Sequence, residues 1–95
     1  MTTRGMVRSI EGTLNARGRR LAIVSSRWHT VITDGLIDGA IRTLKAHGVA
    51  DTDLMVVRVP GSFEIPVACK ALAQTEKFDA IIAVGTLLKG ETAHF

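Results

Sequence analysis

LAIVS at residues 21–25 is a continuous apolar run, of the kind found in a strand that is buried on both faces of a parallel sheet. Two comparable runs follow it, LMVVRV at residues 54–59 and AIIAVG at residues 80–85. Pro60 and Gly61 end the second run, because proline lacks a backbone donor and glycine favours a turn. The three runs predict three buried strands.

A helix is predicted between the first two strands. Apolar residues recur there at intervals of four and mark one face of an amphipathic helix: Ile32, Leu36, Ala40 and Leu44, with Ile37 and Ile41 beside them. Thr30 or Thr33 is expected to cap the start of this helix, and Gly48 is well placed to end it.

A second helix is predicted between the second and third strands. Ser62 is a suitable N-cap, Pro66 falls in the first turn, where its missing N–H does little harm, and the helix runs to about residue 74. The order strand, helix, strand, helix, strand predicts an α/β fold with a parallel sheet and right-handed crossovers.

A single domain is expected in residues 1–95, with the alternating core at residues 21–95 and an N-terminal tail at residues 1–20. Within the tail, residues 6–14 (MVRSIEGTL) alternate loosely and predict an edge strand. This strand has no evident local partner, so it is expected to add to the sheet of a neighbouring subunit. No helix follows the third predicted strand to cover its apolar surface, and the chain is therefore expected to be a truncated form of a longer protein.

The composition is that of a folded protein, with 46% hydrophobic and 22% charged residues. The net charge is only +3, and no basic stripe interleaved with aromatic residues is present, which argues against a nucleic-acid-binding protein. Cys69 is the one cysteine, so a small buried apolar role is expected for it rather than a disulfide or a metal site. No apolar segment has the length of a membrane span or the character of a signal peptide, so a cytoplasmic location is expected.

Polar loops follow all three predicted strands, at residues 25–30, 60–64 and 85–95. The carboxyl ends of parallel strands lie at one edge of a sheet, and ligands of open parallel sheets bind there. The loops are therefore expected to converge on one ligand site. An anionic small substrate would suit the mild positive charge.

The first two loops carry an aromatic residue and a carboxylate, and each has two interpretations. Trp28 either stacks on a planar heterocycle or covers the sheet edge. Glu64 either accepts hydrogen bonds from ligand hydroxyls or is a first-turn acid favoured by the helix dipole. Gly61 would let a ligand approach the backbone closely. His29 and His47 are assigned no function.

The third loop, GTLLKGETAHF, nearly matches the phosphate-binding motif G-x-x-x-x-G-K-[ST]. Glu91 stands where that motif requires lysine, and a carboxylate there would repel the outer phosphates, which excludes a nucleoside triphosphatase. A glycine-bounded loop can still bind a single phosphate through backbone N–H groups, especially if a helix begins after Gly90. His94 is either a proton-transfer group or a surface histidine.

Three motifs, in order, resemble those of the lumazine synthase family: SSRWHTVITDGLIDGA at residues 25–40, VRVPGSFEIPVA at residues 57–68 and AVGTLLKGETAHF at residues 83–95. The resemblance covers nearly all of this chain but only the N-terminal portion of a family member. It implies a flavodoxin-like three-layer α/β/α fold with a parallel sheet, of which the C-terminal part is missing here.

The resemblance also implies an activity. The family condenses 5-amino-6-(D-ribitylamino)uracil with 3,4-dihydroxy-2-butanone 4-phosphate to 6,7-dimethyl-8-ribityllumazine in riboflavin biosynthesis, without a metal or organic cofactor. The positions that match the segments holding the pyrimidine and its ribityl chain are Trp28, Ser62, Phe63, Glu64, Thr86, Leu87 and Leu88. Glu91 and Thr92 match the phosphate-binding pair, and His94 matches the proton donor.

Family members assemble as pentamers or larger icosahedral shells, with the substrate pocket shared between neighbours, so the resemblance implies a homo-oligomer and no nucleic-acid or membrane partner. An aromatic wall of the pocket and a phosphate-gripping arginine come from C-terminal segments of the family that this sequence lacks, which implies that the 95-residue chain alone is inactive. Two alternatives remain open here: a non-catalytic flavin- or lumazine-binding or shell-forming module, and a generic phosphate-ligand-binding domain.

Overall fold

The computed structural model describes residues 2–4 and 7–89. Its elements, in chain order, are β1 (Thr2–Arg4), β2 (Val7–Ser9), β3 (Leu21–Ser26), α1 (Thr30–Ala46), the 3₁₀ turn η1 (Asp51–Asp53), β4 (Leu54–Val59), the 3₁₀ turn η2 (Ser62–Glu64), α2 (Ile65–Gln74) and β5 (Ala80–Val84). The strands β3, β4 and β5 alternate with the two α-helices, as the sequence predicts.

β3 lies in the middle of a three-stranded parallel sheet with the order β4-β3-β5. Val24 is in register with Val57 of β4 and with Ala83 of β5. Every residue of β3 is buried, and Ala22 and Ile23 have no exposed surface at all. The prediction of a strand buried on both faces is confirmed, because apolar side chains at successive positions are typical of a parallel strand that is covered on both sides.

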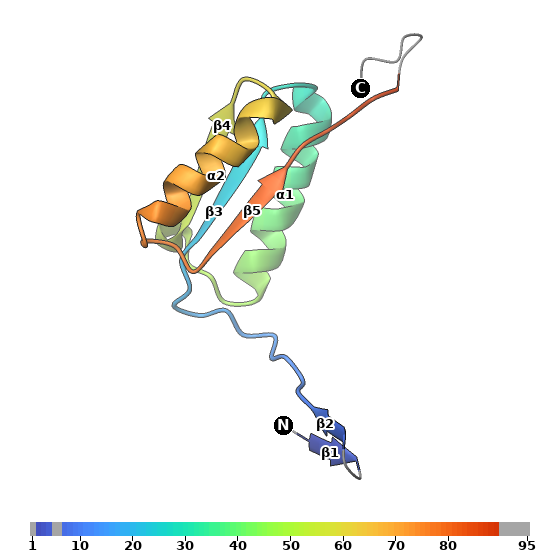
Figure 1. Cartoon of the computed structure of the whole chain (residues 1–95), viewed down its shortest axis with the longest axis vertical. Coiled ribbons are helices and arrows are strands. Elements are labelled where there is room, and N and C mark those ends of the chain that lie inside the picture. Colours follow the sequence, from blue (N-terminus) through green and yellow to red (C-terminus); the bar gives the residue numbers. More distant parts are fainter. Residues whose placement is uncertain (1, 5–6, 90–95) are drawn as a thin grey trace.

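The helices α1 and α2 cover opposite faces of this sheet. The crossover from β3 to β4 runs across the sheet in one direction and the crossover from β4 to β5 runs back in the other, so right-handed connections place their helices on different sides. Figure 1 shows α2 in front of the strands, while β5 passes in front of α1. The expected α/β/α layering around a parallel sheet is confirmed.

The packed face of α1 is rotated relative to the expected one. Thr33 and Ile37 are buried, whereas Ile32 and Leu36 remain 42% and 49% exposed. The apolar surface of this helix is wider than the strip that a three-stranded sheet can cover, so the row that contains Ile37 packs and the adjacent row stays half exposed.

The start of α1 has no threonine cap. His29 occupies the N-cap position in the left-handed region, with φ 53° and ψ 63°, and no side-chain capping bond is formed. The Thr33 hydroxyl instead donates to the His29 carbonyl at 3.2 Å, which closes the first turn from inside the helix. The prediction of Thr30 or Thr33 as the cap is therefore wrong. The predicted end is confirmed, since Gly48 follows the helix with a φ of 99°.

Replacing Gly48 with alanine is expected to lower the free energy of unfolding by about 1 kcal/mol, because a side chain disfavours a positive φ. A Cβ at this position would meet Arg17 Cβ at 3.5 Å, an ordinary contact, so backbone strain and not collision is the cause. Gly39→Ala in the middle of α1 is the matched control, because a Cβ there would have no atom within 4 Å. It is expected to raise the free energy of unfolding by about 0.5–1 kcal/mol in the same denaturant titration. Equal effects of the two substitutions would contradict the assignment.

The start of the second helix differs from the prediction in its cap. Ser62 lies inside the 3₁₀ turn η2, where the Glu64 N–H donates to the Gly61 carbonyl at 3.2 Å, and α2 begins only at Ile65. Ser62 makes no side-chain capping bond, so its prediction as the N-cap is wrong. The 3₁₀ turn pairs the Glu64 N–H, one of the backbone donors at the start of the helix, with a backbone carbonyl, so no side-chain cap is needed for it. Pro66 in the first turn and the end at residue 74 are confirmed.

The N-terminal residues form a hairpin of their own. β1 and β2 pair antiparallel, with Thr3 in register with Arg8. Figure 1 shows this hairpin well away from the three-stranded sheet. The expectation that residues 6–14 lack a local partner is therefore wrong for Val7–Ser9. A two-stranded hairpin is at best marginally stable alone, and its pairing with a neighbouring subunit stays a prediction.

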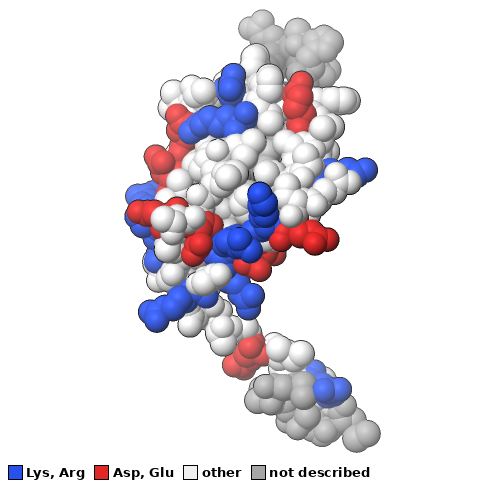
Figure 2. Space-filling model, turned by 90° about the vertical axis from the view of Figure 1, so that its left-hand side faces the viewer, with Lys and Arg blue, Asp and Glu red and all other residues white. Residues whose placement is uncertain are grey.

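The surface carries charges of both signs. On the face that Figure 2 shows, basic and acidic side chains are interspersed, so this face has no continuous basic stripe. Cys69 is half-buried on α2. Within residues 2–4 and 7–89, neither helix combines the length and the apolar character that crossing a bilayer requires.

Candidate functional site

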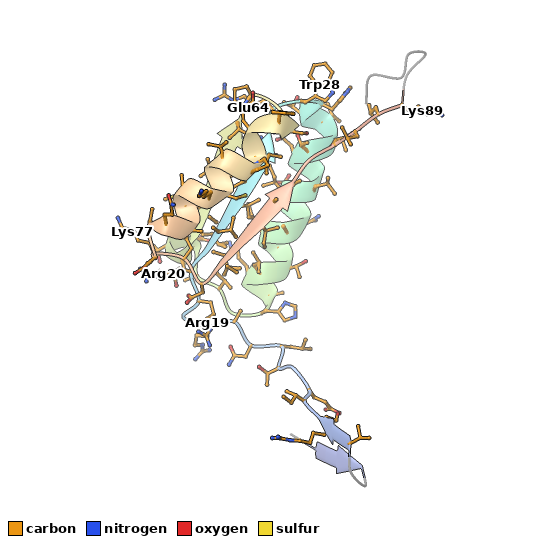
Figure 3. All side chains as sticks on the ribbon, viewed as in Figure 1. Arg19, Arg20, Trp28, Glu64, Lys77 and Lys89 are labelled. Atoms are coloured by element: carbon orange, nitrogen blue, oxygen red, sulfur yellow. The ribbon has the colours of Figure 1, made fainter. Side chains whose placement is uncertain are left out.

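The three predicted loops meet at the carboxyl edge of the sheet. The Arg27 N–H at the end of β3 donates to the Val59 carbonyl at the end of β4, at 2.8 Å. Gly85, directly after β5, lies so close to η2 that a Cβ there would be 3.3 Å from Ser62 Oγ. Figure 3 shows Trp28 and Glu64 together at this end of the three-stranded sheet and Arg19 near the sheet's opposite end. The three strand ends therefore lie at one edge of the sheet, as predicted, and convergence of the third loop beyond Gly85 stays a prediction.

The indole of Trp28 is largely available to a ligand. Its residue is 60% exposed, and its only ring contact among the described residues is an edge-on one with His29, at 4.9 Å between centroids and 81° between planes. A tryptophan that merely covered the sheet edge would have most of its surface packed against the strands. The exposure favours the interpretation of Trp28 as a stacking platform.

The second loop presents side chains outward. Phe63 is 95% exposed, and Glu64 is exposed as well. Glu64 occupies the position before α2 but makes no side-chain capping bond with the helix. Its carboxylate bends back over the turn, since a Cβ at Gly61 would lie 3.1 Å from Glu64 Oε2. The absence of a capping bond does not separate the two interpretations of Glu64, because the helix dipole favours an acid at the start of α2 without a capping bond.

The third loop is described only up to Lys89. Leu87 and Leu88 are 69% and 47% exposed. The phosphate-binding pair and the proton donor, Glu91, Thr92 and His94, lie outside the described residues, and their roles stay predictions.

Two buried hydroxyl groups at this edge have no hydrogen-bond partner within the described residues. They are Ser26 Oγ at the end of β3 and Thr86 Oγ1 just after β5. Buried hydroxyls are nearly always hydrogen-bonded to protein or to ordered water. Because neither of these two has a partner among the described residues, each can still donate and accept a hydrogen bond. The sequence motifs gave no reason to single out Ser26.

An ion pair ties the helix that follows the first loop to the neighbouring strand. Arg58 Nη1 of β4 lies 2.7 Å from Asp34 Oδ1 of α1, in hydrogen-bonding geometry. The side chains are 39% and 50% exposed. No sequence motif indicates this pair. A correct strand register would have placed Arg58 beside Ser25 at the carboxyl edge, but a register between distant parallel strands has no local signal.

The edge is open rather than enclosed. The described residues form no pocket, so these residues alone do not enclose the ligand site that is expected among the three loops. In the same part of the chain, no group of three His, Cys, Asp or Glu residues is placed to hold a metal ion. The functional groups at this edge are therefore an exposed indole, an exposed carboxylate and two buried hydroxyls without a hydrogen-bond partner among the described residues.

Comparisons with known proteins point in one direction. The family model for 6,7-dimethyl-8-ribityllumazine synthase matches residues 18–95. A 6,7-dimethyl-8-ribityllumazine synthase of Aquifex aeolicus is 49% identical over 85 residues, which are 90% of this chain and 55% of that protein. One of Desulfotalea psychrophila is 46% identical over 86 residues, 90% of this chain and 56% of that protein. The chain thus spans little more than half the length of these relatives. On this evidence, the chain belongs to the 6,7-dimethyl-8-ribityllumazine synthase family.

Proposed function

We propose that the protein containing this chain condenses 5-amino-6-(D-ribitylamino)uracil with 3,4-dihydroxy-2-butanone 4-phosphate to form 6,7-dimethyl-8-ribityllumazine. The proposal is supported by the family match together with one structural observation. The strands β3, β4 and β5 end at the same edge of the sheet, and the loop after β3 carries an indole that is 60% exposed. Such an arrangement suits a flat heterocyclic substrate at the carboxyl edge of a parallel sheet.

The pyrimidine substrate is proposed to bind across all three loops. Trp28 stacks on the ring, and Ser62, Phe63 and Glu64 hold the uracil substrate and its ribityl hydroxyls. The backbone of residues 86–88 reads the pyrimidine edge. The outward placement of Phe63 and Glu64 and the proximity of Ser62 to Gly85 support this assignment.

The phosphate of the second substrate is proposed to bind at Glu91 and Thr92 through backbone amides, with His94 as the proton donor. The primary amine of one substrate attacks the ketone of the other, and water leaves to give an imine. Phosphate then leaves by elimination, and the ring closes when the ribitylamino nitrogen attacks the remaining carbonyl carbon and a second water is lost. Each of these steps moves a proton, which a single histidine can shuttle because an imidazole both accepts and donates protons. Holding both substrates in one orientation supplies much of the remaining acceleration.

A homo-oligomer, as a pentamer or an icosahedral shell in the cytoplasm, completes the proposal. Large apolar side chains are exposed around the candidate site, with Val31 at 89%, Phe63 at 95%, Val67 at 73% and Leu87 at 69%. Exposed apolar clusters of this kind are typical of surfaces that another protein chain covers. A neighbouring subunit would also enclose the edge that the described residues leave open. Sedimentation of the full-length protein as a monomer would contradict this part.

Turnover by the full-length protein tests the function itself. With both substrates present, the lumazine product is expected to accumulate, as followed by its absorbance, and omission of either substrate is expected to abolish the signal. No product from a folded, assembled protein would refute the proposal.

A further inference from the structure

The segment that carries Trp28 is held at both of its ends. At its start, the Arg27 N–H donates to the Val59 carbonyl at 2.8 Å. At its end, α1 is joined to the same strand, β4, by the Asp34–Arg58 pair at 2.7 Å. Both anchors lie on adjacent residues of β4, so one strand end fixes the two sides of the loop.

The loop between these anchors has a backbone conformation that needs support. His29 lies in the left-handed region with a φ of 53°, which residues other than glycine adopt infrequently. The Thr33 hydroxyl bonds the His29 carbonyl at 3.2 Å and so fastens this residue to the first turn of α1. Asp34 follows Thr33 directly, and its carboxylate is therefore well placed to hold that turn against β4.

The pair itself adds little to folding stability. Its side chains are 39% and 50% exposed, and exposed ion pairs contribute weakly because water screens them. Its placement is more specific, since it joins α1 to β4 at Asp34, one residue after the Thr33 whose hydroxyl bonds the His29 carbonyl. Trp28 lies between that turn and the strand end, is 60% exposed, and has His29 as its only ring contact among the described residues. Because much of the indole is not packed, its direction depends on where the backbone of the loop is held.

We propose that Asp34 and Arg58 are positioning residues that hold the Trp28 indole over the carboxyl edge of the sheet, ready to stack on a planar ligand. The role as a ligand platform rests on the proposed function, whereas the ordering of the indole does not.

The test compares Asp34→Asn with the parent full-length protein. Time-resolved fluorescence anisotropy reports the motion of Trp28, whose signal is isolated by subtracting the emission of a Trp28→Phe protein. We expect faster indole motion in Asp34→Asn, an unchanged midpoint of thermal unfolding, and a KM for the pyrimidine substrate about two- to fivefold higher at unchanged kcat. Reversing both charges, in Asp34→Arg with Arg58→Asp, is expected to restore much of the order.

Asp51→Asn is the matched control. It removes another exposed ion pair of α1, Lys45–Asp51 at 2.9 Å, which lies at the far end of the helix. Indole motion in this variant is expected to equal that of the parent. Should Asp34→Asn behave like Asp51→Asn in both anisotropy and KM, the positioning role is overturned. Faster indole motion in Asp34→Asn, in a protein that gives no turnover in any form, would uphold the positioning and reject the proposed function.

Discussion

Replacing His94 with alanine in the full-length protein is expected to lower kcat by about 10²-fold, the usual contribution of a general acid–base group. The KM values of both substrates are expected to change little, because His94 is assigned to proton transfer and not to binding. Steady-state kinetics across a range of both substrate concentrations would separate the two parameters.

His47→Ala provides the comparison for His94. His47 closes the C-terminal end of α1, with its Nδ1 atom 2.7 Å from the Thr43 carbonyl oxygen, and it lies outside the candidate site. Its variant is expected to turn over at the parental rate. A His94 variant that keeps the parental kcat would remove His94 as the proton donor, whatever its effect on KM.

Replacing Trp28 with alanine is expected to raise the KM for the pyrimidine substrate by about tenfold, in line with the contribution of one aromatic side chain stacked on a base. The physical reason is the loss of a flat apolar surface that is 60% exposed in this structure and therefore available for stacking. The KM for the butanone phosphate is expected to stay near its parental value, since the proposed phosphate contacts come from another loop.

Trp28→Phe tests whether the effect depends on an aromatic face. Phenylalanine keeps a smaller stacking surface at the same position, so its KM for the pyrimidine substrate is expected to lie within about threefold of the parental value. Equal rises for Trp28→Ala and Trp28→Phe, or equal rises in both KM values, would argue that Trp28 shapes the loop and does not stack.

Most of the fold could be predicted from the sequence, because strands and helices are indicated by hydrophobic patterns within short segments. Uninterrupted apolar runs identify β3 and β5, and the interval of four identifies α1. The details that failed depend on tertiary context. Which row of α1 packs depends on the width of the sheet, so Ile37 is buried while Leu36 is half exposed. The cap of α1 failed because His29 adopts a left-handed conformation, which no short-range rule demands of histidine.

The site was predictable at the level of loops and not of contacts. Parallel topology alone places the three strand ends at one edge, and the structure brings Arg27 to Val59 and Ser62 to Gly85. The ion pair between Asp34 and Arg58 was missed, since opposite charges far apart in a sequence identify no partner until the register is known. The chemistry assigned to Glu91, Thr92 and His94 came from the family motif and stays a prediction.

The central place of β3 has a kinetic consequence. Leu21 pairs with both Leu54 and Ala80, so neither of its neighbours is close to it along the chain. Contacts between distant segments require large loops to close before they yield any stabilisation, and chains dominated by them fold slowly for their size. The loops around Trp28 and Gly85 become neighbours only after the last of these pairings forms. A chain in which β5 has not yet paired with β3 therefore lacks part of the edge at which the ligand is proposed to bind.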